Sequence, residues 1–210
     1  MWHTYFTPHT LDETRELLSK HSDQARLVAG GTDLLIEIER GIRSPENVID
    51  ISRVSGLDSI TRDAAGTIHL GPLVTHNQVV GSKLCVEAAF PLVKACWEIG
   101  APQIRNRGTI AGNLVTASPA NDTITPLWAL NTSLTLRSVR GERRLTFEEF
   151  FLGVRRTALE PDEMIVDIAF PAMLSDQIGT FKKLGLRRAQ AISVVNVTVL
   201  LRMLADTVTE

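Results

Sequence analysis

Residues 103–114 read Gln103-Ile104-Arg105-Asn106-Arg107-Gly108-Thr109-Ile110-Ala111-Gly112-Asn113-Leu114, and the chain continues through Thr116-Ala117-Ser118-Pro119-Ala120-Asn121-Asp122. This stretch is too polar for a core strand. Glycine lets backbone N–H groups approach a charged group closely, Thr and Asn add short donors, and a following Asp can accept from sugar hydroxyls. The pattern is therefore typical of a loop that wraps a phosphate-bearing ligand. An irregular loop with turn-forming Gly and Asn accounts for it equally well.

A second glycine-containing segment lies near the N-terminus. Residues 26–29 predict a strand, the diglycine Gly30-Gly31 follows, and residues 34–40 predict a short helix that ends at Gly41. A helix start presents free N–H groups, so this turn is another candidate phosphate site, and a tight turn between packed elements is the equal alternative. The glycines follow neither the Rossmann spacing nor the P-loop spacing, which disfavours the common nucleotide folds.

Composition narrows the function classes. The 210 residues suit one large or two small domains, and 44% hydrophobic residues are enough for a conventional core. A net charge of −2 with only short arginine pairs predicts no nucleic-acid binding. The two cysteines indicate a reducing compartment and are too few to hold an iron–sulfur cluster. The five histidines lack the spacing of zinc sites, so we predict no metal site.

No stretch is apolar and long enough for a membrane span, and the N-terminus lacks the basic and apolar regions of a signal peptide. We therefore expect a cytoplasmic protein that carries no export or anchoring signal of its own.

Strands and helices interleave with hairpins, which predicts an α+β fold of two small sheet-and-helix lobes. Thr10-x-x-Glu13, Thr75-x-x-Gln78 and Thr146-x-x-Glu149 are capping boxes that start helices, and the third helix is expected to end near Gly153. Alternating polarity predicts hairpins at 59–70 and 133–145. The remaining predicted elements are strands at 4–6, 47–51 and 164–170 and helices at 92–99 and 122–130. The apolar run 192–204 is predicted to be buried, with no obvious partners in the sequence.

Taken together, residues 28–35 and 103–114 resemble the two flavin-binding signatures of the FAD-binding (medium) subunit of the molybdenum hydroxylases, the group of carbon monoxide dehydrogenase and xanthine dehydrogenase. Ser118-Pro119-x-x-Asp122 and Phe181-Lys182-Lys183 follow in the same order, and the likeness extends from Thr7 to about Val199. The resemblance implies the two-lobed FAD-binding fold of vanillyl-alcohol-oxidase or PCMH type. It implies domains at 1–55 (first FAD-binding lobe), 56–175 (second lobe) and 176–210 (the start of a C-terminal domain).

The resemblance also implies a set of residues around FAD. Backbone and hydroxyl groups of Ala29, Gly30, Gly31, Thr32, Asp33 and Leu34 would contact the pyrophosphate. Thr109, Ile110, Ala111, Gly112 and Asn113 would form a second strip along the dinucleotide, and Asp122 would accept from a cofactor hydroxyl or amine. Ile165 and Lys182 would border FAD, with Lys182 as a cation near a ring carbonyl or phosphate. A solvated lysine before a core strand is the alternative for Lys182. No catalytic side chain is assigned, because the flavin itself carries the chemistry.

Three departures from the family pattern stand out. Ala111 replaces a common glycine, with little expected effect. No cysteines are present for the extra cluster of the benzoyl-CoA-reductase branch. Most of the C-terminal domain, which contacts partner subunits in the family, has no counterpart here, and exposure of the apolar run 192–204 is then expected.

The function that the resemblance implies is that of an oxidoreductase subunit in a heterotrimer. A large subunit would hold molybdopterin and hydroxylate the substrate, and a small subunit would carry 2Fe-2S clusters. FAD on this chain would pass electrons to an external acceptor, with NAD, a quinone and oxygen all open, and the substrate is not specified. Two alternatives are a stand-alone flavin oxidoreductase of the same fold and a non-enzymatic module that has lost FAD.

Overall fold

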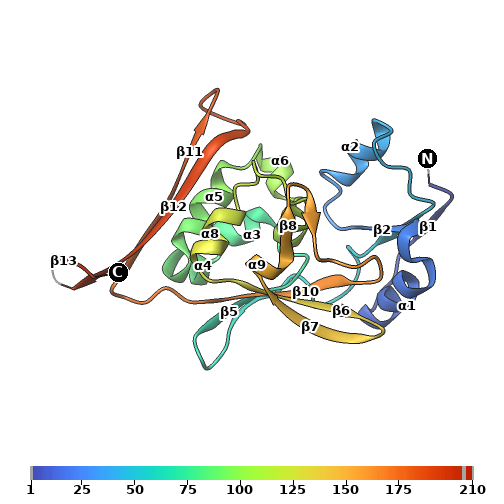
Figure 1. Cartoon of the computed structure of the whole chain (residues 1–210), viewed down its shortest axis with the longest axis horizontal. Coiled ribbons are helices and arrows are strands. Elements are labelled where there is room, and N and C mark those ends of the chain that lie inside the picture. The colour runs from blue at the N-terminus through green and yellow to red at the C-terminus, as the bar shows by residue number, and fades with distance from the viewer. Residues whose placement is uncertain (1, 205–206, 210) are drawn as a thin grey trace.

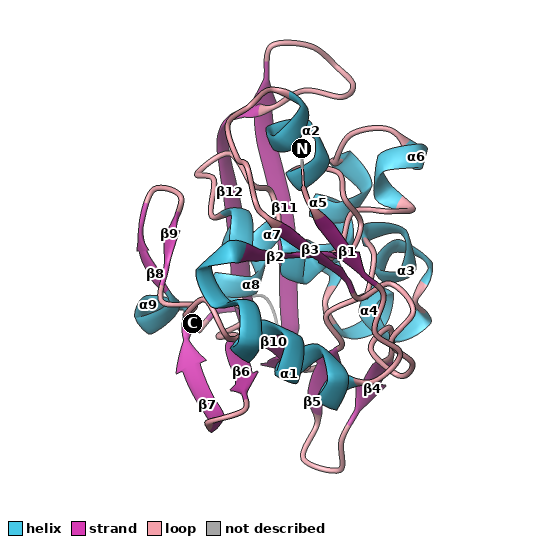
Figure 2. Cartoon of the chain, turned by 90° about the vertical axis from the view of Figure 1, so that its right-hand side faces the viewer, coloured by secondary structure: helices cyan, strands magenta, loops and turns pink. Residues whose placement is uncertain are grey.

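The computed structural model describes residues 2–204 and 207–209. A small first lobe is built on three parallel strands in the order β1-β3-β2. Its elements are β1 (Thr4–Phe6), α1 (Leu11–His21), η1 (Ser22–Gln24), β2 (Ala25–Val28), α2 (Leu34–Glu39) and β3 (Asn47–Asp50). Figure 2 shows this sheet edge-on in front of the helices of the second lobe, with α1 below it and α2 above it.

The second lobe is a five-stranded antiparallel sheet in the order β4-β5-β10-β6-β7 with helices stacked on one face (Figure 1). Its strands are β4 (Ile60–Arg62), β5 (Thr67–Leu70), β6 (Ser133–Ser138), β7 (Gly141–Thr146) and β10 (Met164–Pro171). Its helices are α3 (His76–Gly81), α4 (Lys83–Ala88), α5 (Phe90–Glu98), α6 (Pro102–Arg105), α7 (Ile110–Thr116), α8 (Ile124–Ala129) and α9 (Phe147–Phe150). The α+β fold of two lobes is therefore confirmed.

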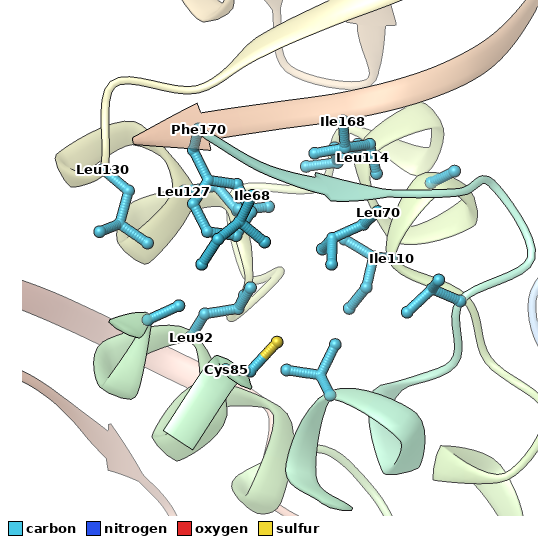
Figure 3. Close-up of a cluster of buried hydrophobic side chains, with 14 of the residues drawn as sticks. Ile68, Leu70, Cys85, Leu92, Ile110, Leu114, Leu127, Leu130, Ile168 and Phe170 are labelled. Atoms are coloured by element: carbon cyan, nitrogen blue, oxygen red, sulfur yellow. The ribbon is translucent and has the colours of Figure 1, made fainter. Parts of the chain in front are cut away.

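Each lobe has its own hydrophobic core. In the second lobe, Ile68, Leu70 and Phe170 from the sheet meet Leu92 and Leu127 from the helices, all essentially without solvent exposure (Figure 3). Full burial of such side chains contributes roughly 1.5–3 kcal/mol each. In the first lobe, a smaller cluster lies between α1 and its sheet and includes Met164 of β10. Strand β10 therefore contributes to both cores and joins the lobes.

Several local predictions are confirmed. Thr75 and Thr146 each cap a helix in a complete capping box. In each box, the Thr hydroxyl accepts from the backbone N–H three residues later, and the side chain of that later residue accepts from the backbone N–H of the Thr. At Thr10 the box is only half formed: the hydroxyl accepts from Glu13 N, but the Glu13 carboxylate accepts from the N–H of His9 instead of Thr10. The hairpins at β4–β5 and β6–β7 lie where the alternation predicts them.

The predicted helix from Thr146 to Gly153 is too long. Helix α9 ends at Phe150, and Phe151–Gly153 forms β8, which pairs with β9 (Arg156–Thr157). Gly153 and Arg155 both have positive φ, at 147° and 54°, so the chain turns sharply there. Strand pairing replaces the last helical turn.

The apolar run 192–204 is also not buried as predicted. It forms β12 (Ser193–Leu204), which pairs with β11 (Gln177–Gly185) and with β13 (Thr207–Val208). One face of this ribbon packs on α5, where a Cβ on Gly179 would lie 2.5 Å from Pro91 Cγ. Side chains on the opposite face, such as Val197 at 54% exposure, reach solvent. In Figure 1 the ribbon runs diagonally past α5 and α8.

Candidate functional site

The first glycine segment forms the turn between β2 and α2. Gly31 has φ +73°, a conformation that glycine adopts without steric cost. No hydrogen bond of the described residues uses the backbone N–H groups of residues 30–33. This turn therefore offers a row of unsatisfied donors.

Gly30 has a different role from Gly31, because its Cα lies directly against the second segment. A Cβ built on Gly30 would lie 1.9 Å from the carbonyl oxygen of Arg107. The absence of a side chain at Gly30 therefore lets the two segments touch.

The second segment is folded into α6, a short turn and α7. The Thr109 hydroxyl caps α7 by accepting from Gly112 N at 3.0 Å. Residues on either side are pinned to the loop before α3, because His76 N donates to Gly108 O at 3.1 Å and Ile110 N donates to Val74 O at 2.9 Å. The polar stretch predicted to wrap a ligand is thus an ordered pair of helix starts.

The two segments line one cleft of about 710 Å³ between the lobes. The β8–β9 hairpin and the start of β10 complete its walls, with Arg155, Glu163 and Ile165 among the lining residues. A second cavity of about 620 Å³ adjoins it and shares Ala29, Gly30 and Thr109 as lining residues.

Eleven of the fourteen predicted site residues line the larger cleft: Ala29, Gly30, Gly31, Thr32, Asp33, Leu34, Thr109, Ala111, Gly112, Asn113 and Ile165. The lining does not include the other three. Ile110 lies in the core of the second lobe, Asp122 is buried beside the C-terminal ribbon, and Lys182 lies on the exposed face of β11.

Asp122 forms a buried ion pair with a lysine that the sequence analysis did not select. Lys183 Nζ lies 2.7 Å from Asp122 Oδ2, and both side chains are only 7% exposed. Lys183 also donates to the carbonyl oxygens of Glu98 at 2.9 Å and Ala191 at 3.1 Å, and Ser193 Oγ donates to Asp122 Oδ1. The period of two in a strand could have found this residue, because Lys183 shares the inward face with buried Phe181.

Of the arginines in the second segment, Arg105 is used internally. Its guanidinium donates to the carbonyl oxygens of Ile99 and Gly100 and to Asn77, and it lies 5.1 Å from the ring centre of Trp97. Arg105 therefore ties α6 to the end of α5 and to α3. Arg107 lines the smaller cavity instead.

Charges at the mouth of the cleft act on Asp33. Burial, and then the negative charge of Glu37, raise the pKa of the Asp33 carboxyl. Glu37 faces Arg155 across the cleft, with 3.6 Å between Glu37 Oε1 and Arg155 Nη1, and it also pairs with Arg43 at 2.5 Å. An ion pair thus links α2 to the β8–β9 hairpin.

His76 is a further polar group of the cleft wall, and no pattern in the sequence points to it. It is only 3% exposed, and its Nδ1 lies 3.6 Å from the thiol of Cys96. Burial, helped by the charge of Arg105, lowers the pKa of His76 to about 4. The imidazole is therefore neutral near pH 7.

This arrangement fits an elongated ligand with a phosphate group. Residues 30–33 offer free N–H donors, and Thr32 and Asn113 add side-chain donors. Residues of both lobes line the cleft, so an elongated ligand in it can contact both. The fold and the cleft define a two-lobed domain with a cleft between its lobes that suits a nucleotide-like cofactor.

Comparison with known families and proteins specifies the class. Residues 2–173 match the family model described as "FAD binding domain in molybdopterin dehydrogenase". The chain is 39% identical over 195 residues to the nicotinate dehydrogenase FAD-subunit of Eubacterium barkeri, covering 91% of this chain and 66% of that protein. It is 34% identical over 181 residues to the carbon monoxide dehydrogenase medium chain of Hydrogenophaga pseudoflava, covering 86% of this chain and 62% of the relative.

Solved structures agree. Carbon monoxide dehydrogenase from Hydrogenophaga pseudoflava superposes with a TM-score of 0.95 at 30% identity, covering 100% of this chain and 72% of that chain. Quinoline 2-oxidoreductase from Pseudomonas putida 86 gives 0.90 at 26% identity, covering 98% and 70%. This chain belongs to the family of FAD-binding domains of molybdopterin dehydrogenases.

The chain spans slightly less than two thirds of the length of these two relatives. None of the described helices combines the length and the hydropathy that crossing a membrane requires.

Proposed function

We propose that this chain holds FAD in the cleft between its lobes and works as the electron-transfer subunit of a molybdenum-containing hydroxylase. The observation that carries the proposal is the meeting of the two glycine segments at one cleft, with free N–H groups in the first. When bound, FAD supplies the redox chemistry, accepting electrons and passing them on. The residues of this chain bind and orient it.

In this proposal, the N–H groups of residues 30–33 bind the pyrophosphate, and Thr109, Ala111, Gly112 and Asn113 run along the dinucleotide. Ile165 borders the cofactor as part of the opposite wall. The resemblance also implies contacts at Ile110, Asp122 and Lys182, which do not line the cleft, so we assign them no cofactor atom. We propose that Lys183, paired with Asp122, fixes the C-terminal ribbon beside the site.

The partners in this proposal are an iron–sulfur subunit that delivers electrons and a molybdopterin subunit that hydroxylates the substrate. The assembly would be a cytoplasmic heterotrimer with an external electron acceptor. Names of relatives support this assignment: they include the medium chain of carbon monoxide dehydrogenase and the FAD-subunit of nicotinate dehydrogenase.

We further propose domain boundaries at 1–55, 56–175 and 176–210. Support comes from the separate cores of the two lobes and from the ribbon β11–β12, which has one exposed apolar face. Residues 205–206 and 210 of the third segment lie outside the described residues.

The test is the visible absorption spectrum of the purified chain before and after incubation with FAD, with the unbound excess removed. Flavin bands, and FAD but not FMN released on denaturation, are the expected result. Gly31→Val should abolish flavin retention. Gly41→Val is the matched control, because Gly41 has a similar φ of +70° but open space around it. A flat spectrum after reconstitution, or equal flavin content in both variants, would contradict the proposal.

A further inference from the structure

His76 lies where the loop before α3 meets the second glycine segment. Its backbone N–H donates to Gly108 O, and a Cβ built on Gly108 would lie 3.2 Å from His76 Cδ2 and 3.4 Å from Nε2. The imidazole atoms Cδ2 and Nε2 therefore pack against a residue that has no side chain. It is also part of the lining of the larger cleft.

The two ring nitrogens of His76 have different surroundings. Nδ1 faces the thiol of Cys96 at 3.6 Å. No hydrogen bond within the described part of the chain uses Nε2, and Nε2 is not among its fully buried atoms without a partner. Because His76 as a whole is 3% exposed, the small exposed part of this residue includes Nε2.

The contact with Cys96 fits two positions of the ring proton, because either the Cys96 S–H donates to Nδ1 or an Nδ1–H donates to the sulfur. Burial keeps the imidazole neutral, and burial likewise raises the pKa of the Cys96 thiol, so both groups are uncharged near neutral pH. A thiol S–H that donates to Nδ1 leaves the ring proton on Nε2. His76 then presents an N–H donor to the cleft.

We propose that His76 Nε2 donates a hydrogen bond to an acceptor oxygen or nitrogen of the bound FAD, and that Cys96 is the positioning residue that selects this tautomer. The proposal rests on the proposed function, because it requires FAD in this cleft. A ligand that fills the cleft excludes water from Nε2, and an acceptor on the ligand then keeps this donor hydrogen-bonded. Gly108 contributes because any larger residue would push the ring away from its position.

The direct test is the ¹⁵N NMR spectrum of the wild-type chain labelled at histidine, with and without FAD. The chain has five histidines, and the His76→Gln variant identifies the signal of His76 by its absence. We expect the Nε2–H signal of His76 to shift and to exchange more slowly with solvent when FAD binds. The other four histidines serve as internal controls. A His76 signal that does not move while FAD binds would overturn the proposal.

Binding measurements test the same contact independently. His76→Leu should weaken FAD binding about tenfold, the effect expected for one hydrogen bond to a ligand. His76→Gln, whose amide places an N–H near the position of Nε2, should recover most of this loss. The midpoint potential of the bound flavin should change in His76→Leu and return toward the wild-type value in His76→Gln, which a purely structural role does not predict.

The outcomes separate this inference from the proposed function. If the wild-type chain binds no FAD, the proposed function fails. If it binds FAD and His76→Leu retains wild-type affinity and flavin potential, only the role of His76 fails. If His76→Leu does not fold, the NMR experiment on the wild-type chain, with His76→Gln for the assignment, is the deciding measurement.

Discussion

Replacing Gly30 with alanine should force the two cofactor-binding segments apart. The added Cβ would lie 1.9 Å from the carbonyl oxygen of Arg107, 2.6 Å from its carbonyl carbon and 3.1 Å from the Cα of Gly108. Non-bonded heavy atoms prefer separations of about 3.5 Å, so the segments must separate by more than about 1 Å. Both sides of the contact are backbone, and no flexible side chain can move away.

The size of the effect follows from this geometry. Overpacking a well-packed site costs about 1–3 kcal/mol, and we expect the upper end here because the obstacle is backbone. For a chain of this length, about 3 kcal/mol corresponds to a Tm lower by roughly 6–12 °C. The donors of residues 30–33 would also lose their alignment with Thr109, so FAD affinity should fall by about 100-fold or more.

Thermal unfolding by circular dichroism and a titration of FAD by flavin fluorescence measure the two effects. Gly81→Ala is the control, because Gly81 is the last residue of α3 and an added Cβ there meets no atom within 4 Å. That variant should keep wild-type FAD affinity and equal or exceed wild-type stability. A Gly30→Ala protein with wild-type Tm and wild-type FAD affinity would refute the close contact between the two segments.

Three further predictions concern charges. Because the pKa of Asp33 is raised in the folded state, its contribution to stability is present below the unfolded value of 3.8 and is lost as the pH rises through the folded value. Asp33→Asn should therefore remove this loss in a pH series of Tm. The same variant should tighten FAD binding about threefold, because it removes one negative charge from the cleft. Burial alone lowers the pKa of His69, but the hydrogen bond and charge of Asp167 outweigh it and raise the pKa, so stability should decline as the pH rises above 6.5; a pH series of urea unfolding should show that decline in the wild type and not in His69→Gln. Lys183→Met should cost about 3 kcal/mol in urea unfolding by leaving a buried carboxylate unpaired, whereas Lys182→Met should change the free energy of unfolding by less than about 0.5 kcal/mol.

Features encoded within a few residues could be predicted from the sequence. Two such features are the capping boxes at Thr75 and Thr146 and the alternation of β6. Residues close in the sequence determine them, so they can be predicted without knowing the fold. The length of α9 is not determined by neighbouring residues alone. Phe151–Gly153 can continue a helix or pair with Arg156–Thr157, and the pairing depends on a turn that the capping box does not specify.

The site shows the same division. The chemistry of both glycine segments is visible in the sequence, and most of the predicted residues line one cleft. The close packing of Gly30 on Arg107 joins residues far apart in the chain, so the sequence does not distinguish a glycine that admits a ligand from one that admits another loop. The role of His76 cannot be predicted from the sequence for a related reason. Its environment is made by Cys96, Arg105 and Gly108, which only the folded chain brings around it.

The two adjacent lysines lie on opposite faces of β11, and the period of two in a strand distinguishes their surroundings. Burial alternates along β11, so Phe181 and Lys183 point inward and Lys182 points to solvent. The inward lysine gives all three of its donors to Asp122 and to the carbonyl oxygens of Glu98 and Ala191. A buried carboxylate with this partner is a structural anchor, and it ties the ribbon β11–β12 to the start of α8. Movement of the ribbon is therefore coupled to the second lobe in two ways, through the ion pair with Asp122 and through the packing of β11 on α5.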